Sequence, residues 1–134
     1  MNYRIRHCLT IIILLLLPVA VQAAHQQRPS FYARYERFST RVLYNMGYTY
    51  LYKRQMADSA LVCFSIIANR KDSRQLADNE LRLYVNAMNY MGNIYSTYYN
   101  RFDLADEYLD RALQTAQENH FIDRLPYIIA TKRM

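Results

Sequence analysis

The chain has 134 residues, enough for one small domain. Hydrophobic residues make up 52% and charged residues 21%, with only two glycines and three prolines. This apolar content excludes a disordered chain, the scarcity of turn residues argues against an all-β fold, and helix is the favoured class. Without Arg4 and Arg6 of the first 23 residues, the formal net charge falls from +6 to +4, a surplus too small to indicate nucleic-acid binding.

Residues 1–24 have the order of a secretory signal peptide. A basic start with Arg4 and Arg6 precedes the apolar run 9–17, and Pro18 leads into small residues. The run is shorter than the roughly 20 apolar residues that a spanning helix needs. We therefore predict cleavage after Ala23 or Ala24 and an exported, periplasmic or extracellular protein. An uncleaved N-terminal membrane anchor is the alternative.

The two cysteines predict no intramolecular disulfide. Cys8 leaves with the signal peptide, so Cys63 remains alone in an apolar helix beside Phe64. We expect Cys63 to be a buried structural thiol.

Residues 25–39 are predicted to be a flexible or capping segment. Phe31, Tyr35 and Phe38 recur at helical spacing and continue to Val42. Ser39-Thr40 is a possible N-cap that would separate this helix from the next one, and the sequence leaves both arrangements open.

The next stretch is repeated. Residues 41–67 recur 45 positions later, with these identities: Met46 and Met91, Gly47 and Gly92, Tyr50 and Tyr95, Asp58 and Asp103, Ala60 and Ala105. Self-similarity at a fixed period indicates repeated structural units. We predict two helical hairpins, 40–70 and 73–119, and the start of a further helix in 120–134.

The expected helices are about 40–54, 58–69, 73–99 and 103–118. Asp58 and Asp103 are expected to be N-caps, and Asp72 with Gln75 resembles a capping box. The stripe of the first helix that is predicted to be buried consists of Val42, Leu43, Met46, Gly47 and Tyr50.

A glycine in the middle of each first helix has a predicted packing role. Gly47 and Gly92 each cost about 1 kcal/mol relative to Ala. Because both copies accept this cost, we expect the partner helix to come close at that point.

The repeated pattern resembles the tetratricopeptide repeat. Leu43-x-x-Met46-Gly47-x-x-Tyr50 with Ala60 and Phe64 carries the resemblance, as does Met88-x-x-Met91-Gly92-x-x-Tyr95 with Ala105 and Leu109. The period exceeds the usual one of about 34 residues, the closing proline is missing, and the interval from Gly to Ala has an extra residue. The resemblance implies a right-handed α-solenoid whose first helices line a peptide-binding groove.

If the resemblance holds, helical geometry gives the residues that face this groove. They lie one step from the buried stripe: Arg41, Tyr44, Asn45, Tyr48 and Tyr52 in the first copy, Asn86, Asn89, Tyr90, Asn93 and Thr97 in the second. Tyr and Asn suit a binding surface. Packing between helices is the competing interpretation, and we favour it for Tyr50 and Tyr95.

No catalytic or metal-binding motif is found in the sequence. His25 and His120 lie far apart, and we interpret Asp106, Glu107 and Asp110 as a solvated helix face. We therefore predict no enzyme and no cofactor.

The expected function is binding of a protein or peptide, without nucleic acid. The sharpest form is the sensor end of a longer bacterial regulator, because signal-led arrays of this family precede a membrane helix and a DNA-binding or kinase domain in some regulators. The alternative is a self-associating scaffold that pairs through the part after Pro126. The basic stretch 28–54 and the acidic stretch 103–123 are compatible with head-to-tail association or with steering of a charged partner, but we favour their interpretation as solvated helix faces.

Overall fold

The computed structural model describes residues 30–73 and 75–132. The described part is all-helical, as the composition predicts, and contains no strand. The signal-peptide prediction, Cys8 and His25 lie outside the described residues. Contacts within the chain define two units, Met1–Arg34 and Tyr35–Met134, and the arrangement given below is that of the second unit.

Helix α2 (Ser30–Glu36) is separate from α3 (Thr40–Tyr52). The Ser39 side chain accepts a hydrogen bond from the Val42 backbone N–H at 3.3 Å, so Ser39 is the N-cap of α3. This cap decides between the two arrangements that the sequence left open.

Two helical hairpins follow. Hairpin 1 consists of α3 and α4 (Ala57–Ser73), and hairpin 2 consists of α5 (Asp78–Tyr99) and α6 (Phe102–Glu118). Helices α4 and α6 have 17 residues each, and their bounds differ by 45 positions at both ends. The sequence period is therefore also the period of the structure. A 3₁₀ turn, η1 (Ile122–Arg124), leads into α7 (Leu125–Lys132).

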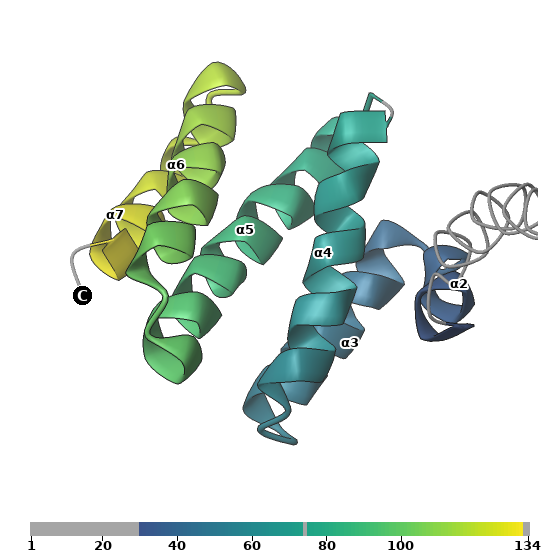
Figure 1. The fold of residues 1–134 in the computed structure, drawn as a ribbon. Helices are drawn as coiled ribbons and strands as arrows, with labels where there is room; N and C mark the ends of the chain where they lie inside the picture. Colours follow the sequence, from purple (N-terminus) through teal and green to yellow (C-terminus); the bar gives the residue numbers. More distant parts are fainter. Residues whose placement is uncertain (1–29, 74, 133–134) are drawn as a thin grey trace, which may run out of the picture. The chain divides into compact units, whose positions relative to one another are not determined.

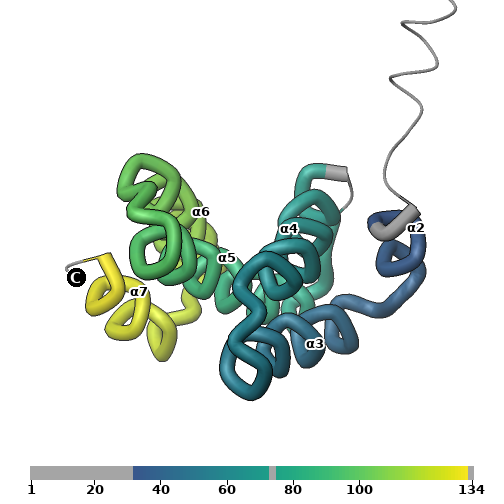
Figure 2. Tube along the Cα trace, turned by 60° about the horizontal axis from the view of Figure 1, so that its bottom comes forward, coloured from purple at the N-terminus to yellow at the C-terminus, as the bar shows by residue number. Residues whose placement is uncertain are grey.

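From α3 to α7, consecutive helices pack on one another, and α3, α5 and α7 also form a row in which α5 contacts both of the others. Figure 1 shows the two hairpins side by side, with α7 beside α6. Figure 2 shows α4 and α6 on one side of this row. The core lies between the helices of each hairpin and between α4 and α5, where Leu43, Phe64, Ile67, Met88 and Met91 are almost completely buried.

The prediction of a close helix approach at the two glycines is confirmed. A Cβ atom on Gly47 would lie 2.6 Å from Cε1 of Phe64, and one on Gly92 would lie 2.6 Å from Cγ of Leu109. In each first helix, the absence of a side chain on the glycine therefore leaves room for one large side chain of the partner helix.

Three predictions about helix ends were wrong. Asp58 and Asp103 are the second residues of α4 and α6, not N-caps. At this position each carboxylate still interacts favourably with the positive end of the helix dipole. Asp72 belongs to the last turn of α4 and lies 3.5 Å from the guanidinium of Arg111 on α6, so no capping box opens α5.

One residue of the stripe predicted to be buried is exposed. Val42 is 41% accessible, whereas Ala87, its equivalent in hairpin 2, is completely buried. Position 87 lies on the helix that packs against hairpin 1, while Val42 lines an open pocket. The same sequence position therefore has different surroundings in the two copies.

Candidate functional site

The row of α3, α5 and α7 carries a polar, aromatic pocket with a volume of about 330 Å³. Its walls come from all three helices and from η1, and its lining residues are Tyr44, Tyr52, Asn86, Asn89, Tyr90, Arg124 and Tyr127. Five of these seven belong to the predicted groove set. The structure thus brings together half of the ten predicted residues.

Tyr90 of α5 lies at the centre of an aromatic cluster. Its ring centroid is 5.5 Å from that of Phe64, on which it stacks, and 5.8 Å from that of Tyr52. Tyr44 and Tyr48 lie at 6.1 and 6.0 Å from it. Tyr90 therefore both packs against hairpin 1 and forms part of the pocket wall.

Burial raises the pKa of Tyr90 and, to a smaller extent, that of Tyr52. Contacts between the phenols themselves act in the same direction. Both hydroxyl groups stay protonated at neutral pH. That of Tyr90 already forms a hydrogen bond with Tyr44, whereas that of Tyr52 can donate to a ligand.

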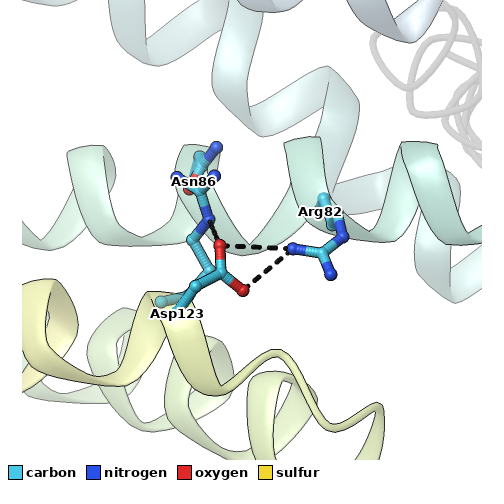
Figure 3. Close-up of polar contacts among 4 residues, drawn as sticks. Arg82, Asn86 and Asp123 are labelled. Atoms are coloured by element: carbon cyan, nitrogen blue, oxygen red, sulfur yellow. Dashed lines mark hydrogen bonds and ion pairs between the residues drawn. The ribbon is translucent and has the colours of Figure 1, made fainter.

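Polar contacts fix η1 to the middle of α5, as Figure 3 shows for Arg82, Asn86 and Asp123. Arg82 Nη1 donates to Asp123 Oδ1 at 3.0 Å and to Oδ2 at 3.3 Å. This hydrogen bond is the main reason that the pKa of Asp123 is lowered. Arg82 also lies over the Phe121 ring, 4.2 Å from its centroid.

Arg124 is placed at the pocket wall by its neighbours. Its Nη1 donates to Asn86 Oδ1 at 3.4 Å. Its Nε lies 3.0 Å from Asp123 Oδ2, close enough for an ion pair but without hydrogen-bond geometry. The charge of Arg124 is thus partly compensated, and the acceptor oxygen of Asn86 is already used.

Asn89 differs from Asn86. Asn89 lines the pocket, but its Oδ1 is buried beneath the surface and has no hydrogen-bond partner. Leaving a buried acceptor unpaired costs about 1–3 kcal/mol, and such a group in a native structure calls for an explanation. A ligand that donates to this oxygen would supply one.

The other predicted groove residues lie outside this pocket. Tyr48 belongs to the aromatic cluster, and Arg41 and Thr97 are exposed on their helices. Asn93 is half-buried, and its backbone oxygen accepts from Ser96 Oγ at 3.0 Å. Asn45 lines a second pocket together with Val42, and this pocket has a volume of about 370 Å³.

The packing role expected for Tyr50 and Tyr95 agrees with the structure. Tyr95 stacks on Tyr108 of α6 with ring centroids 5.4 Å apart. The hydroxyls of Tyr50 and Tyr35 are 3.3 Å apart. Both phenols connect helices.

Two lining residues, Arg124 and Tyr127, were missed by sequence reasoning. They belong to η1 and α7, which the sequence predicted only as the start of another helix. The signal that could have found them is the repeat itself, because a third first helix must extend the same row.

Cys63 is completely buried, as predicted, and burial raises the pKa of its thiol to about 11. Asp106, Glu107 and Asp110 are exposed, and His120 lies exposed in the turn after α6. Among the described residues, no group of three His, Cys, Asp or Glu side chains could hold a metal ion. Between Ser30 and Lys132, none of the described helices combines the length and apolar character needed to cross a membrane.

Comparisons with protein-family models, with curated proteins and with solved structures found no match to this chain.

Proposed function

We propose that this protein is an exported binding module of the tetratricopeptide type, a right-handed α-solenoid that holds a peptide in the pocket formed by α3, α5 and α7. The contacts of α5 with both α3 and α7, together with the shared period of sequence and helices, support the solenoid arrangement. The resemblance of the repeated motif supports the family.

One observation carries the binding role. The buried Asn89 Oδ1 lacks a partner in a pocket whose other lining groups are phenols, an amide and a guanidinium. These groups bind by hydrogen bonds and ring contact, and none of them is a nucleophile activated by a base. A peptide backbone, with N–H and C=O groups at regular spacing, matches such a lining.

Selection of displayed random peptides on the immobilised protein tests this role. We expect enrichment of a peptide family whose binding is lost in Asn89→Ala and retained in Tyr98→Ala. Tyr98 is a matched control, since it is on α5, 50% exposed and outside the pocket lining. The proposal fails if no family is enriched, or if the enriched peptides bind both variants equally.

The location is part of the same proposal. The signal-like order of residues 1–24 supports export, and the resemblance supports a role as the sensor end of a longer regulator. Fractionation of the producing cells tests export. Recovery of the protein only from the cytoplasm would contradict it.

Self-association is a second candidate, because large apolar side chains are exposed on η1 and α7. Ile122 is 73% accessible and Ile129 is 40% accessible. Patches of this kind mark interaction sites when they are contiguous. Sedimentation at micromolar concentration decides the matter. A concentration-dependent dimer that Ile129→Asp abolishes favours the scaffold, and a folded monomer excludes it.

A further inference from the structure

The side chains that line the pocket carry more hydrogen-bond donors than acceptor oxygens. Four of its seven lining residues are tyrosines, two are asparagines and one is arginine, so among these described residues none carries a carboxylate. Asn86 Oδ1 already accepts from Arg124. The ligand that fits this lining is therefore rich in acceptors and poor in donors.

The pocket also presents accessible aromatic rings. Tyr52 is 54% exposed on α3 and Tyr127 is 68% exposed on α7. Tyr48 continues the α3 side, with its ring centroid 4.8 Å from that of Tyr52. Rings of this kind offer flat contact area with little loss of side-chain entropy.

Four classes of peptide differ in how they match these groups. A helical ligand has its backbone carbonyls already bonded, so it cannot use the donors. A cationic ligand meets Arg124 with no carboxylate in the pocket lining. An acidic ligand meets a guanidinium whose charge is already shared with Asp123. A polyproline II segment has solvated carbonyls, few N–H groups and ring side chains that pack on aromatics.

We propose that the pocket binds a proline-rich segment in the polyproline II conformation. Its proline rings lie against the faces of Tyr52 and Tyr127. Its carbonyl oxygens accept from the tyrosine hydroxyls and from the Asn89 amide nitrogen. The Asn89 side chain turns on binding, so that its buried Oδ1 accepts the N–H of one non-proline residue. This assignment rests on the proposed function and names the class of peptide.

Fluorescence anisotropy with a labelled oligoproline tests the assignment. The probe has about ten residues, which span about 30 Å in this conformation, and carries one central alanine to supply the N–H. A Gly-Ser peptide of equal length with the same label is the control ligand. The full chain is used, in mild detergent. We expect saturable binding of the oligoproline and none of the Gly-Ser peptide.

Variants locate the binding. Tyr127→Ala and Asn89→Ala are each expected to weaken oligoproline binding at least about tenfold, and Tyr98→Ala is expected to leave it unchanged. Replacing the central alanine of the probe by proline removes its N–H. This change should weaken binding to the natural protein but not to Asn89→Ala.

The negative outcomes separate this assignment from the proposed function. If the oligoproline does not bind at about millimolar concentration but displayed peptides of another class do so through Asn89, the polyproline assignment is overturned and peptide binding stands. If neither class binds, both fall. Oligoproline binding that Tyr127→Ala leaves unaffected also overturns the assignment, because the binding is then elsewhere on the chain.

Discussion

Hairpin 1 and hairpin 2 share one packing plan and differ on the face that lines the pocket. Phe64 packs against Gly47 and Leu109 packs against Gly92. A Cβ atom on either glycine would lie 2.6 Å from the nearest atom of that side chain. The turns within the two hairpins also match. Gln55 and Asn100 both have a φ of 52°, and Met56 and Arg101 donate backbone N–H bonds of 2.9 Å to residues six positions earlier.

The pocket face differs at equivalent positions of the first helices. Tyr44, Tyr48 and Tyr52 of α3 correspond to Asn89, Asn93 and Thr97 of α5. At these positions hairpin 1 carries rings and hairpin 2 carries short polar groups. Of the six residues, Tyr44, Tyr52 and Asn89 line the pocket, and α5 adds the Tyr90 ring from a neighbouring position. The lesson is that the shared residues specify packing, while the differing ones give the surface its chemistry.

Buried polar groups are a second difference. Both Thr40 and its equivalent in hairpin 2, Val85, are buried, with exposures of 2% and 0%. Thr40 is polar, whereas Val85 is apolar. The Thr40 hydroxyl donates to Glu80 Oε1 at 2.7 Å and accepts from Arg70 Nη1 at 3.0 Å. Arg70 also donates to the backbone oxygens of Glu36 and Phe38. Hairpin 1 thus holds the α2–α3 connection by a polar network.

The largest expected effect comes from Phe64→Ala. The change removes a completely buried ring that fills the space above Gly47 and stacks on Tyr90. We expect a loss of about 3–5 kcal/mol in unfolding free energy. Denaturant unfolding followed by circular dichroism measures it.

Leu109→Ala is the matched change in hairpin 2. Leu109 fills the equivalent space but does not support the tyrosine cluster. We therefore expect Leu109→Ala to lose less unfolding free energy than Phe64→Ala and to keep peptide binding. An equal loss of stability and of binding in the two variants would contradict the division between packing and pocket chemistry.

Thr40→Val makes hairpin 1 resemble hairpin 2 at one buried position. The shape is retained, but Glu80 and Arg70 each lose a hydrogen bond, so the expected cost is about 1–3 kcal/mol. Denaturant midpoints measure it. The reverse change, Val85→Thr, should also destabilise, since it buries a hydroxyl among apolar groups. Tolerance of Thr40→Val would show that the network contributes nothing.

Gly47→Ala and Gly92→Ala test the shared packing. Overpacking costs about 1–3 kcal/mol, and the better helix propensity of Ala offsets about 1 kcal/mol, so a net loss of about 0–2 kcal/mol is expected. In a Phe64→Ala background the overpacking disappears, and Gly47→Ala should become neutral or stabilising. Thermal unfolding of the four proteins of this double-mutant cycle measures the coupling. Additive effects would mean that Phe64 does not set the glycine requirement.

Much of this fold could be predicted from the repeated residues. The 45-residue period, the two glycines and the helical class all follow from sequence identities that recur. Helix ends could not be predicted so well. The usual signal for a helix end is a glycine with positive φ, but Gln55 and Asn100 take that conformation here, and both glycines lie inside helices.

The pocket could be predicted only in part, for a different reason. Helical spacing places Tyr44, Asn89 and Tyr90 on the correct face, but it does not show which of them pack on one another. Tyr90 contacts four rings, so its substitution would disturb packing as well as binding. Arg124 enters the site through a long-range contact with Asn86, and no local pattern carries that information.

Asn89→Leu has the smallest expected effect on stability and separates packing from ligand binding most clearly. Asn89→Leu keeps the approximate size of the side chain and removes an acceptor that is buried without a partner. Because the folded protein gains nothing from that acceptor, the unfolding free energy should change by less than about 0.5 kcal/mol or rise slightly. Peptide binding should nevertheless be lost. Asn93→Leu on the same helix is the control, since Asn93 does not line the pocket and its variant should bind normally. A large loss of stability in Asn89→Leu would mean that Asn89 contributes to the packing of the fold and not to ligand binding.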